Sequence, residues 1–405
     1  MKAQSNGEYA LKGVGVLDLA GERGSFSSRL LADLGARVIK VEIPGGDPSR
    51  GIGPYLGGSP DPEKSLVFYF NNANKLGITL DLQTKEGRRI FLELVRRNDI
   101  IIESYPPGYM DTLDLGPEAL REANPSVVIV SVTGFGQDGP RKDYLTCDLV
   151  ASAFGGQMFI SGEPEKPPIK PYGHQSYYSA SLFATIAALV GLREKRRGRK
   201  NLSFDISLQE SVTATLEHVM IRYFNEEMVA KREGSLHWDR GFCIFPCRDG
   251  SILLTLTQQW TTLVEWMASE NMAEDLLDKK WEEEEYRRKH IDHVIEVIGR
   301  WTRTHMCHDL YEMGQSFRFP WAPVRSPGDV LDCPQLKARK FFMDVEHPEN
   351  DQTLKYPGMP CKFGMPVSEK WKPPPRVGEH NNQIYHEELG IPLQQIERLH
   401  SLGVI

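Results

Sequence analysis

Residues 13–42 read GVGVLDLAGERGSFSSRLLADLGARVIKVE. The mostly apolar run 13–19 predicts a buried strand, residues 27–34 predict a helix that ends at Gly35, and residues 37–42 predict a second strand. A strand, a helix and a strand within about thirty residues form a βαβ unit, and the two strands of such a unit lie parallel. This stretch therefore indicates an α/β fold.

The same alternation continues along the N-terminal half. Three further apolar runs predict strands, at residues 77–82, 99–103 and 127–132. Thr84 has the character of a helix N-cap, and Pro117 opens another helical pattern. Strands that are apolar on both faces belong in the middle of a parallel sheet covered by helices on both sides. The N-terminal half is therefore predicted to be a doubly wound α/β domain.

The remaining chain changes character twice. Residues 176–194 predict a long helix rich in small residues, followed by a basic run at 195–200 that fits a solvated helix end or, alternatively, a contact with phosphates or a partner. Residues 226–324, rich in Met, Trp and mixed charge, predict a small α+β domain. The large domain is expected to combine residues 1–225 with 325–405. In the tail we expect a Pro-rich extended stretch over 321–375 and helix from 381 onward.

Composition limits the function classes. The 405 residues are 40% hydrophobic and 25% charged with a net charge of -7, which is typical of a soluble globular protein and disfavours a nucleic-acid surface. No apolar run has the length of a membrane helix or of a signal peptide's apolar region, so no membrane partner is expected. The six cysteines are scattered, which favours reduced thiols in the cytoplasm. Cys243 and Cys247 lack a second pair at zinc-ligand spacing, so no metal is predicted.

Two glycine-rich loops follow predicted strands. The loop at 20–26 lacks the G-x-G-x-x-G pattern, and Glu22 would repel a pyrophosphate, so a nicotinamide cofactor is disfavoured. The loop at 134–140, GFGQDGP, is expected at the carboxyl edge of the sheet, where open α/β folds bind ligands. Such a loop is either a ligand contact or a simple turn.

An ordered set of motifs extends over nearly the whole chain. It includes the stretches VLDLAGERGSFSSRLLADLGARVIKVE (16–42), GGDPSR (45–50), NANKLGITLDL (72–82), ESYPPGYM (103–110), NPSVVIVSVTGFGQDGP (124–140), CDLVASAFGG (147–156), GLREKRRGRK (191–200), FDISLQES (204–211), APVRSPGDVLDCPQLKARKFF (322–342) and GEH (378–380). Together they resemble the class III CoA-transferases (CaiB/BaiF), a family that also includes CoA racemases and carnitine CoA-transferases.

The resemblance implies a fold and a chemistry. The fold is a Rossmann-like large domain with a smaller α+β domain, and two chains are expected to form an interlocked-ring dimer. The substrates are coenzyme A thioesters and small-molecule acids. In these transferases an aspartate carboxylate attacks the acyl-CoA thioester, the CoA thiolate leaves, and a mixed anhydride forms before the acceptor acid is loaded.

The segment that matches this aspartate reads YGHQSYYS at 172–179, with His174 in the aspartate's position. An imidazole cannot form a carboxylic anhydride. His174 is therefore either a lost nucleophile or a residue acting as a base or through an acyl-imidazole. Asp148 matches an acidic position beside the family's active site, and its alternative role is a helix N-cap.

Several CoA-contacting positions are kept and others are changed. The resemblance assigns CoA contacts to four residues: Lys75, Ser104, Tyr105 and Tyr109. The ring of Tyr105 is expected to stack on the adenine. Cations are missing at Ile43 and Thr112, and the first βα turn has Arg23-Gly24-Ser25 in place of alanine-glycine-proline, which predicts weak CoA binding.

Family members without the aspartate occur as second subunits of heteromeric transferases. We therefore expect this chain to pair with a homologous, aspartate-bearing subunit and to take part in CoA transfer, with succinyl-CoA as donor and benzylsuccinate as acceptor, as in anaerobic toluene degradation. Two alternatives remain open: an acyl-CoA racemase or isomerase that uses His174 and Asp148, and a non-enzymatic CoA-binding scaffold.

Overall fold

The computed structural model describes residues 9–405 apart from 238–240, 257–258 and 365–370. It divides into two compact units. Unit 1 holds the described residues of Met1–Met158, Lys170–Met228 and Lys340–Ile405, and unit 2 holds those of Phe159–Ile169 and Val229–Arg339. Unit 2 thus extends beyond the segment 226–324 that the sequence pattern suggested.

The extra segment Phe159–Ile169 belongs to unit 2 because backbone carbonyls attach it there. The Arg232 guanidinium donates to the carbonyl oxygens of Glu163 and Pro164, at 3.2 Å each. The Gly234 amide donates to the Gly162 carbonyl at 3.1 Å. Nothing in the local sequence pattern indicates these long-range bonds.

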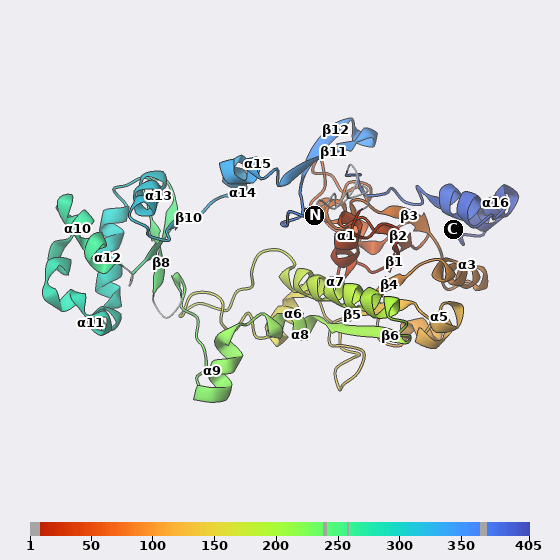
Figure 1. The fold of residues 1–405 in the computed structure, drawn as a ribbon, viewed down its shortest axis with the longest axis horizontal. Helices are drawn as coiled ribbons and strands as arrows, with labels where there is room; N and C mark the ends of the chain where they lie inside the picture. Colours follow the sequence, from red (N-terminus) through yellow and green to blue (C-terminus); the bar gives the residue numbers. More distant parts are fainter. Residues whose placement is uncertain (1–8, 238–240, 257–258, 365–370) are drawn as a thin grey trace, which may run out of the picture. The chain divides into compact units, whose positions relative to one another are not determined.

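Unit 1 contains a six-stranded parallel sheet in the order β3-β2-β1-β4-β5-β6 (Figure 1). Its strands are β1 (Gly15–Leu19), β2 (Arg37–Glu42), β3 (Leu76–Thr79), β4 (Ile100–Glu103), β5 (Val128–Thr133) and β6 (Leu202–Ser207). The α/β prediction is confirmed. The strand order reverses between β1 and β4, and in such sheets the crevice outside the carboxyl ends of these strands binds ligands.

Two details of the sheet differ from the expectation. β3 ends at Thr79 rather than at residue 82, because the Asp81 amide donates to the Val404 carbonyl at 2.7 Å and draws the chain toward the C-terminus. The edge strand β6 was not predicted from its residues. Its exposed and half-buried residues alternate along Leu202–Ile206, so it lacks the continuous apolar run of the inner strands.

Neighbouring residues of the strands face two different cores. One core packs the sheet against α3 (Lys85–Arg96), α5 (Pro117–Ala123) and the C-terminal helical residues, and it contains Leu17, Ile39 and Ile101. The other packs the sheet against α1 (Ser25–Asp33) and α7 (Gln175–Arg196), and it contains Val16, Val38 and Ile100. This alternation is the two-residue period of a strand buried on both faces.

The long helix α7 lies close against the sheet (Figure 1). Ala180, Ala184 and Ala188 are fully buried, and a Cβ added at Gly191 would lie 2.4 Å from the Val128 side chain. At the end of the helix, Lys195 pairs with Asp99 at 2.7 Å, and Glu194 accepts from the guanidinium groups that follow. These contacts fit the interpretation of the basic run as a helix end.

Unit 1 has further α-helices among its described residues. They are α2 (Leu66–Asn72), α4 (Tyr109–Thr112), α6 (Asp148–Phe154), α8 (Leu208–Ala214), α9 (His218–Glu226) and α16 (Leu393–Ser401). The predicted helix after residue 381 is in fact two pieces, a π-helix at Asn382–Glu388 and α16. Gly390, at φ 72, and Pro392 interrupt it, because neither residue continues a helix.

The tail is less extended than expected. It contains the hairpin of β11 (Phe342–His347) and β12 (Gln352–Pro357) in unit 1, and in unit 2 the short helices α14 (Pro327–Asp332) and α15 (Pro334–Ala338), each with a proline in its first turn. Residues 372–381 then run beside β3, where the Asn74 amide donates to the Lys372 carbonyl at 3.1 Å. This segment covers the edge of the sheet.

Unit 2 is an α+β unit with a four-stranded sheet in the order β10-β9-β8-β7. The strands are β7 (Leu236–His237), β8 (Phe242–Pro246), β9 (Ser251–Thr255) and β10 (Ala322–Pro323), and the main helices are α10 (Trp260–Ser269), α11 (Glu284–Lys289), α12 (Ile291–Thr302) and α13 (Cys307–Ser316). Its core is built around Trp301, Phe319 and Trp321.

Candidate functional site

His174 lies directly before the first residue of α7, at the helix N-cap position. Its imidazole makes no capping hydrogen bond, and its ring packs against the Tyr177 ring with 5.3 Å between centroids. The residue in the aspartate's position therefore contributes a ring contact and no carboxylate.

Asp148, the first residue of α6, is buried and links α6 to α7. Its Oδ1 accepts from the Ser176 amide at 3.0 Å and from the Ser176 hydroxyl at 2.8 Å. The N-cap of α6 is Cys147, so Asp148 does not cap its own helix, contrary to the alternative considered above. Instead it satisfies one of the free amides at the start of α7, a role that His174 leaves open.

Lys170 completes this cluster. Its Nζ lies 2.8 Å from Asp148 Oδ2 and also donates to the carbonyls of Pro171 and Gly173. The Asp148 carboxylate is thus engaged by an ammonium, a hydroxyl and an amide. A carboxylate held in this way is poorly placed to take a proton from a substrate carbon, and no described hydrogen bond joins it to His174.

Tyr177 connects the cluster to the turn between β1 and α1. Its hydroxyl accepts from the Asp148 amide at 3.1 Å and donates to Glu22 Oε1 at 3.4 Å. Burial and the negative charge of Glu22 raise the pKa of Tyr177 to about 12, so the phenol stays protonated at neutral pH. The sequence pattern did not single out Lys170, Ser176 or Tyr177. Only the one-turn spacing of Tyr177 from His174 could have indicated a contact.

Lys75 is placed differently from the CoA-contacting residue that the resemblance suggests. It is buried, and its Nζ donates to Asp18 Oδ2 at 2.7 Å, to the Ser25 carbonyl at 2.8 Å and to Asn72 Oδ1 at 2.8 Å. Burial lowers the pKa of Lys75 to about 8 even though Asp18 opposes this shift. All three N–H donors of the Lys75 ammonium are therefore used inside the protein, and none is free for CoA in this conformation. A contact between Lys75 and CoA stays a prediction.

The other three predicted CoA contacts lie together after β4. Ser104 Oγ accepts from the Gly21 amide at 2.9 Å and so joins the end of β4 to the turn after β1. The rings of Tyr105 and Tyr109 lie 5.0 Å apart, and burial raises the pKa of Tyr105 to about 12. The turn at residues 20–24 therefore connects both groups of predicted site residues, through Gly21 on one side and Glu22 on the other.

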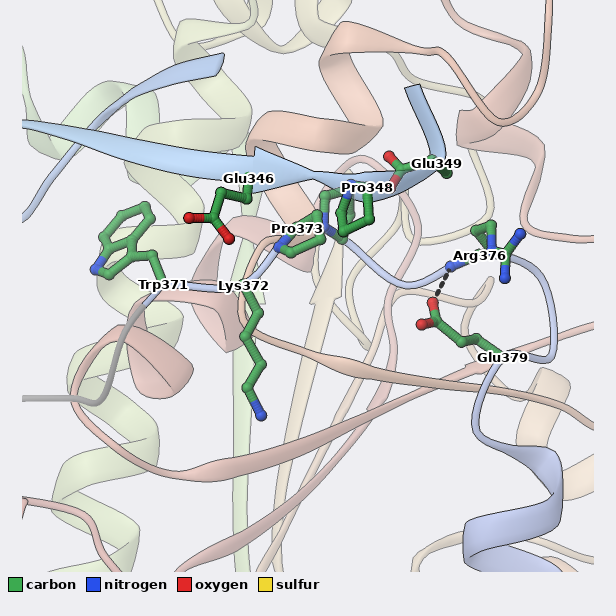
Figure 2. Close-up of a pocket in the computed structure, with 9 residues that line it drawn as sticks. Glu346, Pro348, Glu349, Trp371, Lys372, Pro373, Arg376 and Glu379 are labelled. Carbon is green, nitrogen blue, oxygen red and sulfur yellow. Dashed lines mark hydrogen bonds between the residues drawn. The ribbon is translucent and has the colours of Figure 1, made fainter. Parts of the chain in front are cut away.

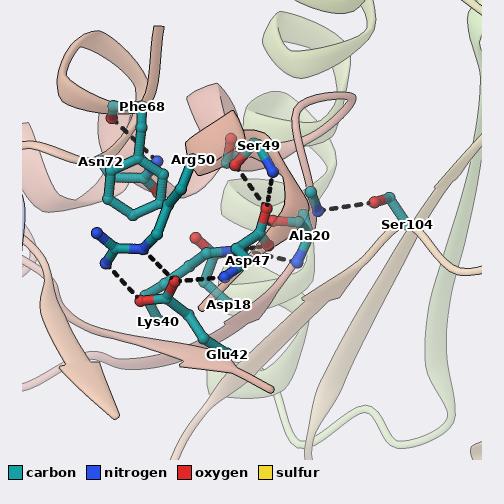
Figure 3. A network of polar contacts seen from close by, with 12 residues as sticks. Asp18, Ala20, Lys40, Glu42, Asp47, Ser49, Arg50, Phe68, Asn72 and Ser104 are labelled. Atoms are coloured by element: carbon teal, nitrogen blue, oxygen red, sulfur yellow. Dashed lines mark hydrogen bonds and ion pairs between the residues drawn. The ribbon is translucent and has the colours of Figure 1, made fainter. Parts of the chain in front are cut away.

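A network of buried charges supports this turn from below (Figure 3). The Ala20 amide donates to Asp18 Oδ1 at 2.9 Å, and the Lys40 ammonium donates to the Ala20 carbonyl at 2.5 Å and to Asp47 Oδ2 at 2.9 Å. Burial alone would lower the pKa of Lys40, but the carboxylates of Asp47, Asp18 and Glu42 together hold it above its usual value. The Lys40 ammonium is thus a permanent charge inside the protein.

The GGDPSR motif contributes a second part of the same network. Arg50 donates to both oxygens of Glu42, at 2.6 and 2.8 Å, and its guanidinium lies 3.9 Å from the centre of the Phe68 ring (Figure 3). Bidentate pairs of this kind fix orientation as well as charge. The motif therefore holds the loop after β2 in place, and none of its ion pairs requires a ligand.

A cavity of about 570 Å³ lies elsewhere in unit 1 (Figure 2). It is lined by the end of β11 and by the tail, at Glu346, Pro348, Glu349, Trp371, Lys372, Pro373, Pro374, Arg376 and Glu379. None of the site residues predicted from the sequence lines it.

Metal sites, membrane helices and cysteines also bear on the function. In the part of the chain that the structure describes, no group of three or more His, Cys, Asp or Glu side chains is arranged to hold a metal ion. Among the same residues, no helix combines the length and apolarity needed to cross a membrane. All six cysteines are free thiols.

Comparison with known proteins identifies the family. The model of CoA-transferase family III matches residues 11–381. The succinyl-CoA:(R)-benzylsuccinate CoA-transferase subunit BbsE of Thauera aromatica is 33% identical over 96% of this chain and 97% of its own length. The human succinyl-CoA:glutarate CoA-transferase is 29% identical over 100% and 92%.

Among solved structures, a CaiB/BaiF family protein from Brucella suis matches with a TM-score of 0.86 and 26% identity, covering 94% of this chain and 100% of its own. The matches span the whole described fold rather than one unit, and the curated relatives act on CoA thioesters of small acids. The chain therefore belongs to CoA-transferase family III and is a CoA-transferase by family.

Proposed function

We propose that this chain is the non-nucleophilic subunit of a heteromeric CoA-transferase, in which a homologous subunit carries the aspartate. The observation behind this proposal is His174 in the nucleophile's position, with the buried carboxylate at the start of α7, Asp148, already committed to Ser176 and Lys170. Its substrates would be an acyl-CoA donor such as succinyl-CoA and a carboxylic acid acceptor such as (R)-benzylsuccinate, because BbsE, named as a subunit of the enzyme for that reaction, is similar over nearly its full length.

The chemistry explains why a histidine cannot take over the aspartate's role as nucleophile. When a carboxylate attacks a thioester, the CoA thiolate leaves and an anhydride remains, from which the acyl group can be exchanged for another acid. An imidazole attack would release the same thiolate and leave an acyl-imidazole. Water hydrolyses this species readily, so the energy of the thioester would be lost. A transferase is therefore expected to use the partner's aspartate.

Exposed apolar side chains support the presence of a partner chain. On α7, Leu182, Phe183, Ile186 and Val190 are between 38% and 56% exposed, and α9 buries none of its residues while exposing Ile221 and Phe224. Apolar surface of this kind on a folded protein commonly marks an interface. We include the interlocked pairing typical of the family in the proposal.

Substitution in the assembled enzyme tests the proposal. With both subunits co-expressed, His174→Ala in this chain is expected to leave turnover nearly unchanged, whereas replacing the partner's aspartate by alanine should abolish it. His174→Asp is the matched variant that asks whether a second site can be restored. CoA transfer by the isolated chain, lost in His174→Ala by several orders of magnitude, would show that His174 is catalytic and that the proposal is wrong.

The two alternatives have less support. A racemase would need His174 and Asp148 as an acid and base facing one carbon, but Asp148 is tied to Ser176 and Lys170. Racemisation of a chiral acyl-CoA by the purified chain would favour that function. A scaffold without activity would show no transfer in any combination of subunits.

A further inference from the structure

The turn between β1 and α1 lies where an α/β protein of this topology can bind a phosphate, but four of its backbone amides are already used. Such sites work when amides at the start of a helix point freely at the anion. Here Ala20 donates to Asp18 and Gly21 donates to Ser104, each at 2.9 Å. The Gly24 and Ser25 amides both donate to the Gly21 carbonyl. Four amides of the turn are therefore closed to a ligand.

The buried cations beside the turn are also neutralised. Lys40 is paired with Asp47, and Lys75 is paired with Asp18 at 2.7 Å. Both ammonium groups are fully buried and have no donor directed to the surface of the turn. Their fields are largely cancelled by these carboxylates, so they offer little attraction to a polyanion.

The charge balance at the surface of the turn therefore depends on two neighbouring residues, Glu22 and Arg23. Arg23 has no carboxylate within ion-pair distance among the described residues, and its guanidinium donates to the Thr146 carbonyl at 2.8 Å. Glu22 is half-buried and hydrogen-bonded to Tyr177, so its carboxylate is held at the turn rather than free to swing into solvent. Both side chains act on Tyr177, which shows that they share one small region.

We propose that Glu22 is a specificity-determining residue that makes this turn reject the phosphate groups of coenzyme A. Its charge offsets that of Arg23, and the four paired amides and the paired, buried cations add little attraction for an anion. The inference rests on the proposed function in one respect, since it takes the carboxyl edge near this turn to be where CoA would enter. It adds a second cause for the predicted weak binding of CoA: the negative charge of Glu22, beside the missing cations at Ile43 and Thr112.

Calorimetric titration of CoA into the isolated full-length chain tests this inference. Glu22→Gln keeps an acceptor for the Tyr177 hydroxyl and removes only the charge. We expect it to tighten CoA binding about tenfold at low ionic strength, and the gain should shrink as salt is added because exposed charges are screened. Arg23→Gln should loosen binding. Glu118→Gln, an exposed glutamate in the first turn of α5, is the matched control and should change nothing.

Pantetheine, which has no phosphates, distinguishes an effect of the Glu22 charge on phosphate binding from an effect on the shape of the site. Its affinity should be the same for the wild-type chain and for Glu22→Gln. Unchanged or weaker CoA binding by Glu22→Gln, including no measurable binding by either protein, would overturn the inference, as would an equal gain for pantetheine. None of these outcomes depends on the partner subunit. The silent-subunit proposal can therefore fail in the turnover experiment while this inference stands, and the reverse also holds.

Discussion

Two clusters at the carboxyl edge of the same sheet have different characters. The network around Lys40, Asp18 and Arg50 is buried, and every charge in it is paired (Figure 3). In the cluster around His174, the carboxylate of Asp148 is paired, but within the described part of the chain the imidazole has only a ring contact. The scaffold that shapes the first βα turn is thus intact, whereas in the proposed function the carboxylate that performs the chemistry comes from the partner subunit. A fold and its catalytic group can be kept or lost independently.

The largest effect is expected from breaking the buried network. Lys40→Met should lower the free energy of unfolding by about 3–5 kcal/mol, because it leaves the largely buried Asp47 carboxylate without its ion-pair partner. Urea denaturation followed by circular dichroism measures this. Lys355→Met is the matched control: its pair with Asp344 is exposed, so its loss should have little effect. Equal effects of the two variants would show that the buried network does not stabilise the first βα turn.

The contact between α7 and the sheet should be the next most sensitive. Gly191→Ala places a Cβ 2.4 Å from a side-chain carbon of Val128, which is closer than non-bonded carbon atoms can approach. The helix or the strand must therefore shift. We expect a loss of roughly 1–3 kcal/mol in unfolding free energy. Gly191→Ala combined with Val128→Ala should recover part of it. Wild-type stability of the single variant would contradict the close packing.

Glu103 should produce a smaller and pH-dependent effect. Burial raises the pKa of this carboxyl to about 7, above its ordinary value of 4.5. The folded state then binds more protons than the unfolded state between these two values. Stability is therefore fully present below about pH 4.5 and falls as pH rises toward 7. Glu103→Gln should gain ~2 kcal/mol over wild type at pH 8 and little at pH 4.5.

Thermal unfolding of both proteins across this pH range checks the sign. A gain that is the same at all pH values would mean that burial does not raise the pKa of the Glu103 carboxyl. Glu118→Gln on the exposed start of α5 serves again as the control and should show no pH-dependent difference.

Much of unit 1 could be predicted because its signals are local. The inner strands are continuous apolar runs, and the N-cap of α3 is Thr84 as expected, accepting from the Gly87 amide at 3.0 Å. The engagement of Asp148 could not be predicted, because Ser176 lies 28 residues away and no periodicity connects them. The position of Lys75 was assigned by resemblance, but the direction of its ammonium depends on Asp18, which is 57 residues away.

The smallest structural effect is expected at His174, the position on which the proposed function depends. Among the residues that the structure describes, His174 makes no capping bond and has one ring contact, so His174→Ala should change the unfolding free energy by less than about 0.5 kcal/mol. A larger loss in urea denaturation would mean that the imidazole has a structural role. Gln175→Ala, on the adjacent residue, serves as the local control.

The release of free CoA in the absence of an acceptor acid tests the central claim most directly. When succinyl-CoA is mixed rapidly with the assembled enzyme, each competent nucleophile releases one CoA thiolate as it is acylated. We predict one equivalent per heteromeric pair, unchanged by His174→Ala, and none from this chain alone. Two equivalents per pair, or release by the isolated chain that His174→Ala removes, would contradict the account.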